Sequence, residues 1–600
     1  MKICLCSLPV EGANQPLDRQ RHEGPLGIVP KTAILSLVYE MQRNGYDSSQ
    51  YDFYDIDMLY PSDQELIDYF TEYRPDIVGL SAVTSTSYQQ VKRISNIVKS
   101  VLPKTFIVVG GNITAADEAI LRCTSSDICV QGDGEIAWGK ILSILREYKT
   151  IFKNELLSQI KGISYINENN MYISNGFGEP LPSTTLAFPD YKILASGLKK
   201  HPEYIYNHFR KAANSGWFTT DERAKESHRP PNIAGLFLSK GCVTRCTFCL
   251  RSTKGYRTVP LVNLEHYLLY LRDNFDVGFI QVMDENFGSD KKHAYEAARI
   301  FKKADVLWIA TGVRCKSVNE EDLKFYKEHN CSALKFGVES GSQKILDLME
   351  KKFDVDDVYT ALRVCAKYNI FSPLAIMVGM PGETLETAKE TGRFIGKIAL
   401  MLNTHPKNLN YDLFYALPFP GTPLYDYGVK SGVLDSTPEG TDKYLTDVSN
   451  AGTYKRYYVN LNGATMKEVV FWDWLVKLEA SRIYNCNKVQ SNDKIVETAF
   501  KTNQVLEKNT NPHLSLKYTS ITFTGISKFF DFYVEGNKLV DLIPRFIIYP
   551  ILKYMAYLEY LIQRLFDNNR KHNIFKFNGV KVTRLQVDKS HKKSLRNFLD

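Results

Sequence analysis

Short apolar segments alternate with helical patterns along two stretches of the chain, and this rhythm limits the fold more than any other feature. In the first stretch, residues 1–150, five apolar segments are each followed by a helical pattern. Repeated strand–helix units are typical of a parallel sheet covered by helices on both faces. We therefore predict an α/β domain over residues 1–150, doubly wound and Rossmann-like. The clearest strand segments are KICLCSL (2–8), DIVGLSAV (76–83), TFIVVGG (105–111) and DICVQGDGE (127–135).

Small and polar residues follow the predicted strands of this first domain. In doubly wound sheets, ligands bind outside the carboxyl ends of the strands, where glycine-rich turns let the backbone approach a large polar molecule. One glycine turn after a strand is commonly only a turn, but three turns on one edge favour a binding site. The residues expected there are Ser81, Thr84, Gly110, Gly111, Asn112, Gly132 and Glu135, with Asp133 and Gly134 between the last two.

The strand–helix rhythm restarts at residue 232. Six strand patterns separated by helical patterns are too few for a closed eight-stranded barrel but enough for a partial (β/α)6 barrel over 232–434. Residues 151–231 have loop chemistry and a Pro-Pro break, so we predict a connecting region there. Residues 435–600 are expected to be mainly helical, with one helix over 466–485 and a basic tail at the end.

Length and charge exclude some classes of protein. The chain has 600 residues, which is too long for one hydrophobic core. Its net charge is +8, but nine Lys and Arg against three Asp fall between Asp567 and Asp600, so the rest is close to neutral. That distribution disfavours a broad nucleic-acid-binding face, and we expect no nucleic-acid partner. We interpret the tail as a solvated segment.

Cysteine usage and hydropathy indicate a cytoplasmic protein. Eleven cysteines in this length do not form a disulfide scaffold, and the first residues read as a strand rather than a signal peptide. No segment has the roughly eighteen uninterrupted apolar residues of a membrane span. The nearest is 539–566, which prolines and charges interrupt. It fits a packed helix, or an interfacial helix that gives peripheral membrane contact.

Three cysteines lie together in GCVTRCTFC (241–249), directly after the first predicted barrel strand. This position puts Cys242, Cys246 and Cys249 at the mouth of the barrel, where active sites lie. A structural zinc site needs four ligands, and the nearest downstream histidine, His266, falls in a predicted helix. An iron–sulfur cluster held by three cysteines would instead leave one iron open to a small molecule. The spacing favours a cluster and leaves zinc as the alternative.

The segment SKGCVTRCTFC resembles the signature of the radical S-adenosylmethionine (SAM) superfamily, C-x3-C-x2-C, with aromatic Phe248 before the last cysteine. The resemblance covers about 234–430 and implies that the three cysteines hold a [4Fe-4S] cluster. Four further segments resemble motifs of that family in order and spacing: MDENF (283–287), KFGVESGSQKILDLMEK (335–351), VGMPGET (378–384) and PFPGTPLY (418–425).

The same resemblance implies how SAM binds and reacts. The fourth iron takes the amino and carboxylate groups of SAM, and an electron from the cluster cleaves it to methionine and a 5′-deoxyadenosyl radical. Glu339 and Ser340 would contact the ribose or methionine part, and Arg314 is a weaker candidate for the carboxylate. No catalytic residue is assigned. The implied cofactor-binding residues of this domain are Phe248, Asp284, Glu339, Ser340, Gly379, Pro381, Gly382 and Glu383.

The first domain resembles the cobalamin-binding domain of B12-dependent radical SAM proteins. The resemblance implies cobalamin at the seven residues named above for the sheet edge. The D-x-H-x2-G motif that supplies a histidine to cobalt in other B12 proteins is absent, because Asp18 and His22 have the wrong spacing. Asn112 stands where proline is more usual. The lower axial ligand of cobalt therefore stays unassigned. The matching segments are 24–47, 78–88, 108–115 and 130–138.

Together the two resemblances imply an enzyme that uses SAM twice, to methylate cobalamin and to make the radical. The substrate radical would then take methyl from methylcobalamin at an unactivated carbon or at phosphorus. The alternatives are B12-dependent cyclisation or carbon–carbon coupling without methyl transfer, and a non-catalytic cobalamin or SAM sensor, which the intact motifs disfavour. A tRNA methylthiotransferase is disfavoured because no RNA-binding pattern follows residue 435. Expected partners are a flavodoxin or ferredoxin as electron donor and a small-molecule or lipid-linked substrate.

Overall fold

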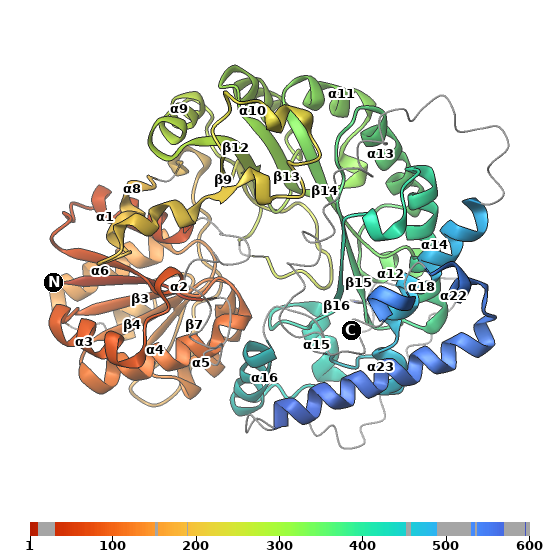
Figure 1. Ribbon diagram of the computed structural model, residues 1–600. Coiled ribbons are helices and arrows are strands. Elements are labelled where there is room, and N and C mark those ends of the chain that lie inside the picture. The colour runs from red at the N-terminus through yellow and green to blue at the C-terminus, as the bar shows by residue number, and fades with distance from the viewer. Residues whose placement is uncertain are drawn as a thin grey trace.

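The computed structural model describes residues 1–9, 31–149, 154–188, 190–251, 253–451, 458–488, 530–534, 537–568 and 595. Asp18, His22 and most of the basic tail lie outside these residues. In the described part, two seven-stranded sheets follow one another along the chain, and helices form the C-terminal region (Figure 1).

The first sheet has the strand order β2-β1-β3-β4-β5-β6-β7. Its first five strands are parallel, which confirms the predicted doubly wound domain. Strands β6 and β7 are antiparallel and lie in the region expected to connect the domains, so part of that region completes the sheet. The strands are β1 (Ile3–Ser7), β2 (Tyr51–Asp55), β3 (Ile77–Ser81), β4 (Phe106–Gly110), β5 (Ile128–Val130), β6 (Ile163–Ile166) and β7 (Tyr172–Ser174).

Helices cover both faces of this sheet (Figure 1), and the inner strand β1 is buried along its whole length. A capping box at Ser62 begins α3. The Ser62 hydroxyl accepts from the Glu65 amide at 3.3 Å, and the Ser62 amide donates to the Glu65 carboxylate at 2.8 Å. The helices are α1 (Thr32–Arg43), α2 (Ile56–Leu59), α3 (Asp63–Tyr73), α4 (Tyr88–Val101), α5 (Asp117–Cys123), α6 (Glu135–Tyr148), α7 (Asn154–Leu157) and α8 (Lys192–Ser196).

The second sheet has the order β16-β15-β14-β13-β12-β9-β8, and the six strands from β16 to β9 are parallel. This arrangement confirms the partial (β/α)6 barrel, with β8 added antiparallel at its edge. The strands are β8 (Arg210–Lys211), β9 (Asn232–Leu236), β12 (Val277–Val282), β13 (Leu307–Val313), β14 (Cys331–Glu339), β15 (Leu374–Val378) and β16 (Tyr411–Tyr415). The helices are α9 (Leu264–Phe275), α10 (Lys291–Lys303), α11 (Glu320–Glu328), α12 (Gln343–Leu348), α13 (Val355–Lys367), α14 (Leu385–Met401) and α15 (Pro423–Lys430).

A small hairpin interrupts the barrel after β9 and carries the cysteines. Strands β10 (Ser239–Gly241) and β11 (Tyr256–Thr258) are antiparallel, and the three cysteines lie in the loop between them. The loop is tied to neighbouring turns, because the Thr247 hydroxyl donates to the carbonyl of Leu348 at 3.0 Å and the Leu424 amide donates to the carbonyl of Thr247 at 3.0 Å. The cysteine loop is therefore fixed to the end of α12 and the start of α15.

The C-terminal region is helical, as predicted. The single helix expected over 466–485 is two helices instead, because Phe471 bonds the carbonyl of Glu468 and tightens the turn between them. Helix α18 lies close against α14, where a Cβ atom at Gly392 or Gly396 would stand 2.7 Å from atoms of α18. The helices are α16 (Pro438–Ala451), α17 (Met466–Val469), α18 (Trp472–Lys488), α22 (Lys538–Leu542) and α23 (Arg545–Asn568).

Candidate cofactor sites between the two sheets

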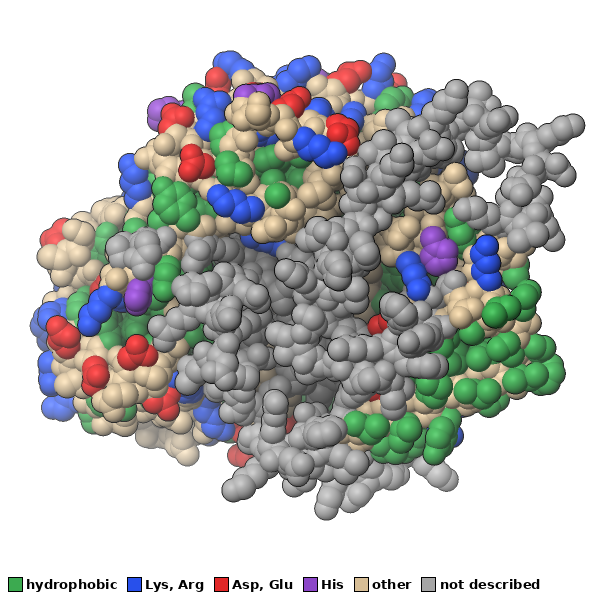
Figure 2. All heavy atoms as spheres, viewed as in Figure 1, with side chains coloured by type: hydrophobic (Ala, Val, Ile, Leu, Met, Phe, Trp, Pro, Cys, Tyr) green, Lys and Arg blue, Asp and Glu red, His purple; other side chains and the backbone are tan. Residues whose placement is uncertain are grey.

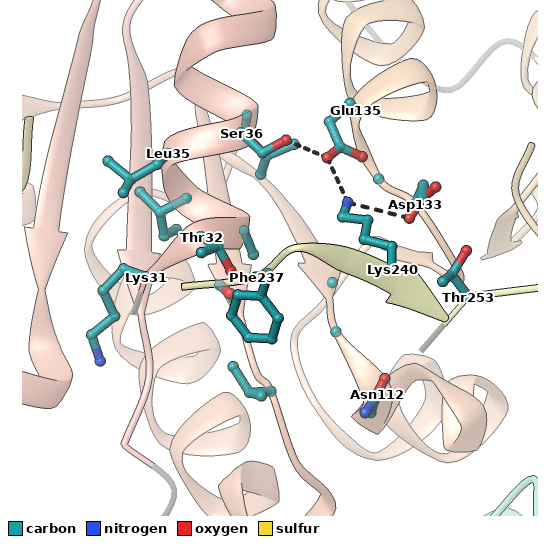
Figure 3. A pocket seen from close by; sticks show the side chains of 18 of the residues that line it. Lys31, Thr32, Leu35, Ser36, Asn112, Asp133, Glu135, Phe237, Lys240 and Thr253 are labelled. Atoms are coloured by element: carbon teal, nitrogen blue, oxygen red, sulfur yellow. Dashed lines mark hydrogen bonds and ion pairs between the residues drawn. The ribbon is translucent and has the colours of Figure 1, made fainter. Parts of the chain in front are cut away.

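The carboxyl edge of the first sheet opens onto a cavity of about 920 Å³ that both domains line. Ser81 and Gly110 are paired in register at the ends of β3 and β4, which brings the turns after these strands together. From the barrel side, Phe237 and Lys240 reach the same space (Figure 3). All seven residues expected at this edge line the cavity: Ser81, Thr84, Gly110, Gly111, Asn112, Gly132 and Glu135.

Two adjacent glycines shape the wall of the cavity. No atom lies within 4 Å of the place where a Cβ atom at Gly110 would stand, so this position leaves the wall open. Gly111 has a φ of +103°, and a Cβ atom there would lie 2.1 Å from the carbonyl oxygen of Ala82. Only glycine suits that turn. The result is a flat, backbone-lined edge that fits a large ring ligand such as cobalamin.

Ion pairs connect this edge to the cysteine hairpin. Arg257 of β11 donates to Asp133 at 2.7 Å, and both side chains are largely buried. Lys240 of β10 lies 3.4 Å from Asp133 and 3.3 Å from Glu135, which also accepts from Ser36 (Figure 3). Sequence analysis did not single out Lys240 or Arg257, because their partners lie more than 100 residues away.

A buried cluster of charges lies at the end of β2, beside the cavity. Burial raises the pKa of Asp55, but nearby Lys31 and His208 and a hydrogen bond from Ser7 outweigh it and lower that pKa to about 2. The Ser7 hydroxyl donates to Asp55 at 2.6 Å, and His208 lies 3.3 Å from it. Lys31 also pairs with Asp57, and these two side chains line the cavity. The sequence carried no signal for this cluster.

The three cysteines offer a thiolate donor set with hydrogen-bond donors around it. The sulfur of Cys242 accepts from the Thr244 amide at 3.4 Å and from the Asn286 side-chain amide at 3.5 Å. Loss of water around the thiol raises the pKa of Cys249 to about 12, and the nearby Cys246 adds to this rise. The residue as a whole is exposed. Bound iron would reverse that rise by stabilising the thiolate. The donor set therefore fits a cluster.

A zinc site at the three cysteines would need a fourth ligand such as a histidine. His266 lies in α9, as its sequence context predicted.

Glu339 and Lys351 form a buried ion pair beside the cysteine loop. Glu339 has a φ of +72°, a strained left-handed conformation for a residue with a side chain. Its carboxylate lies 3.3 Å from the Lys351 ammonium, which also stands 5.7 Å from the centre of the Phe248 ring. Burial alone would lower the pKa of Lys351, but Glu339 and Cys246 raise it. Lys351 belongs to a motif segment, yet sequence analysis gave it no role.

Other residues expected at the SAM site lie at the same end of the barrel. Ser340 is buried and bonds Thr391 at 3.2 Å and the amide of Ser342 at 3.1 Å. Gly379 and Gly382 have positive φ values in the turn after β15, with Pro381 between them. Ser340 thus holds its own turn in place, and its contact with SAM stays a prediction.

Two carboxyl groups of the predicted set are buried. Asp284 accepts from the Ser239 hydroxyl at 2.6 Å and the Leu238 amide at 2.8 Å, and burial raises its pKa to about 6. Burial also raises the pKa of Glu383 to about 7, against hydrogen bonds from Thr387 and the Gly379 amide. Asp284 therefore braces β9 against β12, which orients the cysteine hairpin, and its cofactor contact stays a prediction.

The remaining predictions about single residues concern Arg314 and the other cysteines. Arg314 donates to the carbonyl of Lys351 at 2.9 Å. It therefore supports the turn that carries Lys351, the ion-pair partner of Glu339. Six of the eight other cysteines are buried, as expected for small apolar side chains: Cys4, Cys6, Cys129, Cys315, Cys331 and Cys365. Cys486 is exposed and Cys123 is partly exposed.

Two family models match the chain, one in each domain. The model of the B12 binding domain matches residues 35–142, and the model of the Radical SAM superfamily matches residues 236–395. The matched ranges contain the cavity-lining turns and the three cysteines, respectively.

Two curated proteins and one solved structure are similar to the chain over much of its length. An uncharacterized methyltransferase from Pyrococcus horikoshii is 25% identical over 72% of this chain and 84% of its own. The anaerobic magnesium-protoporphyrin IX monomethyl ester cyclase from Cereibacter sphaeroides is 24% identical over 66% of this chain and 60% of its own. The cobalamin-dependent SAM radical enzyme OxsB, solved with aqua-cobalamin and SAM, has a TM-score of 0.59 and 14% identity over 97% of this chain and 82% of its own. The structural likeness shows a shared fold.

Proposed function

Because the chain belongs to the cobalamin-dependent radical SAM proteins, we propose that it transfers a methyl group from SAM, by way of cobalamin, to an unactivated carbon of its substrate. The observation that carries this proposal is the shared cavity. Its walls include the glycine turns of the first sheet, and also Gly241, the neighbour of the first cluster cysteine. The three cysteines and the residues expected to contact SAM do not line this cavity themselves. The methyl carrier would therefore lie in the cavity, and the radical source would lie beside it, next to Gly241.

The chain's own residues would hold and orient the two cofactors. When bound, the cluster supplies the electron that cleaves SAM to a radical, and cobalamin supplies the methyl group. Cys242, Cys246 and Cys249 would ligate the cluster, and Glu339, held by Lys351, would bind the polar part of SAM. The backbone at Gly110 and Gly111 would support the corrin ring. Closure of the cavity by both domains would exclude water from the radical.

The finer assignments of partners and regions belong to the same proposal. A low-potential flavodoxin or ferredoxin would supply the electron, and the substrate would be a small or lipid-linked molecule. The chain would act in the cytoplasm, with peripheral membrane contact through 539–566. We propose the functional division 1–150 for cobalamin, 151–231 for connection, 232–434 for radical chemistry and 435–600 for the remaining helical region.

Cyclisation without methyl transfer is the second candidate. The Cereibacter sphaeroides protein supports it, because this relative matches two thirds of this chain and bears the name of a cyclase. Both reactions would use the same cofactors, so the product distinguishes them.

Reconstitution with iron, sulfide and hydroxocobalamin under anaerobic conditions tests the proposal. We expect about four irons and one cobalt per chain after desalting. Cys242→Ala should lose iron and keep cobalt, whereas Gly110→Phe, which fills the open wall, should keep iron and lose most of the cobalt. SAM labelled in its methyl group should then label a product made from candidate substrates.

Cys486→Ala is the matched control, since this exposed cysteine is remote in sequence from the loop and should leave both metals unchanged. Iron without retained cobalt would contradict the cobalamin assignment. Radical cleavage of SAM with an unlabelled, cyclised product would replace methyl transfer by the second candidate.

A further inference from the structure

Helices α22 and α23 carry apolar side chains on the outer surface of the C-terminal region. One side of α23 packs into the protein through Ile548, Leu552 and Ala556, which are buried. The opposite side faces solvent, where Phe546 is 79% exposed. Figure 2 shows such hydrophobic side chains gathered at the lower right of the molecule. We name this surface the outer stripe, and its residues are Leu539, Leu542, Phe546, Ile547, Ile551, Tyr554 and Leu558.

The charges around the outer stripe are one-sided. Both acidic residues between positions 537 and 562, Asp541 and Glu559, are buried. The basic residues of the same segment keep solvent contact, since Lys538 is exposed and the Arg545 side chain is half exposed. Nine further Lys and Arg against three Asp follow in the sequence from 567 to 600. Within the described residues 537–562, the charge that reaches solvent beside the stripe is therefore positive, which complements an anionic surface.

The arrangement fits a bilayer surface better than a protein groove. Ile547, Ile551, Tyr554 and Leu558 recur every three or four positions, so they form one line along α23, which Phe546 precedes. The ammonium groups of Lys467 and Lys389 lie 4.9 Å and 5.5 Å from the rings of Tyr554, on this line, and of the partly buried Tyr549. Tyrosine and lysine side by side are typical of the lipid headgroup level. None of the described helices is long and apolar enough to cross a bilayer.

We propose that this protein docks on the surface of an anionic lipid bilayer through α22 and α23. The helices lie in the plane of the membrane, the outer stripe enters the boundary between headgroups and acyl chains, and Lys538 faces lipid phosphates. The proposal does not depend on the proposed methyl transfer, because vesicle binding needs no bound cofactor.

Co-sedimentation of the full chain with vesicles tests the proposal. Vesicles of mixed phosphatidylglycerol and phosphatidylcholine should sediment the protein, and pure phosphatidylcholine should sediment much less. Phe546→Asp with Ile551→Asp should lower the partition coefficient at least about tenfold, because both apolar anchors are lost. Lys538→Glu should weaken binding at low salt, and the difference from the unchanged protein should disappear when salt is added.

The matched control places the same two charges on exposed apolar residues elsewhere. Val262→Asp with Met171→Asp should bind vesicles as the unchanged protein does. Circular dichroism and gel filtration verify that each variant is folded. The proposal is overturned if the protein fails to sediment with anionic vesicles. It is also overturned if the variant with Phe546→Asp and Ile551→Asp binds them as well as the unchanged protein does. If the unchanged protein does not bind vesicles but forms a concentration-dependent dimer, and Phe546→Asp with Ile551→Asp abolishes that dimer, the outer stripe binds a second copy of the chain instead.

Discussion

Glu383 is a carboxyl group that the fold keeps out of water. Burial raises its pKa to about 7, against 4.5 for a free side chain. Below about pH 4.5 the group is protonated in both the folded and the unfolded state, so it does not affect stability. As the pH rises from 4.5 to 7 the unfolded state loses its proton first, and the folded state is destabilised by about 3 kcal/mol above pH 7.

Glu383→Gln should therefore stabilise the protein without cofactors at pH 8, by up to about 3 kcal/mol, and change little near pH 4.5. Urea unfolding of both proteins at the two pH values measures the difference. Glu386→Gln is the control, because Arg393 lowers the pKa of this exposed carboxyl and the small effect should have the opposite sign. An equal gain at both pH values would show that folding does not raise the pKa of Glu383.

At the scale of elements, one buried carboxylate attaches α23 to α18. Glu479 has no solvent exposure and accepts from Arg545 at 2.9 Å and from Tyr549 at 2.5 Å. Removal of one partner of a buried, hydrogen-bonded ion pair is strongly unfavourable. Because half of the Arg545 side chain stays in water, Glu479→Ala should cost roughly 1–2 kcal/mol through its lost hydrogen bonds, and it should speed amide hydrogen exchange in α23 while exchange in α3 stays unchanged.

A partly exposed ion pair provides the comparison for Glu479→Ala. Glu468 lies 3.5 Å from Lys553 of α23, and both side chains are about one third exposed. Glu468→Gln keeps the capping box at Thr465 and should change stability by no more than about 1 kcal/mol. If both variants have the same small effect, Glu479 does not hold the helix.

At the scale of the whole molecule, the two domains are joined by charges and by a helix. Asp133 of the first domain is nearly inaccessible and pairs with Arg257 and Lys240 of the cysteine hairpin. On another side, α16 meets α4 through Asp442, which lies 2.7 Å from both Lys92 and the Tyr88 hydroxyl. These contacts set the position of the cysteine loop relative to the cavity.

Asp133→Ala should leave two cations near the interface without their shared partner. We expect a loss of about 3 kcal/mol and separate unfolding transitions for the two domains in place of one. Calorimetry measures both changes. Glu179→Ala, which removes an exposed pair with Lys161, should cost less than about 1 kcal/mol and keep the shape of the transition. A single unshifted transition for Asp133→Ala would show that this charge cluster does not couple the domains.

Local sequence patterns determined the parallel strands of both sheets, the position of the cysteine loop and the edge that forms the cavity, but not the antiparallel strands β6, β7 and β8. The spacing of apolar residues predicts strands and helices, and glycine predicts turns, so Gly110, Gly111 and Asn112 could be placed without coordinates. The three cysteines and the motifs after β14 and β15 were readable because each lies within a few neighbouring residues. The break between α17 and α18 could not be read from the sequence, because the tightened turn does not change the spacing of the apolar residues.

Only the tertiary structure decided which charges meet. Asp55 with Lys31 and His208, Asp133 with Arg257, and Glu479 with Arg545 are pairs or clusters whose members lie 24 to 153 residues apart. The energy of such contacts depends on distance and burial, which no local pattern encodes. The same reason applies to the outer stripe. The sequence of α23 left a packed and an interfacial helix open, and the fold buries one side of it and exposes the other.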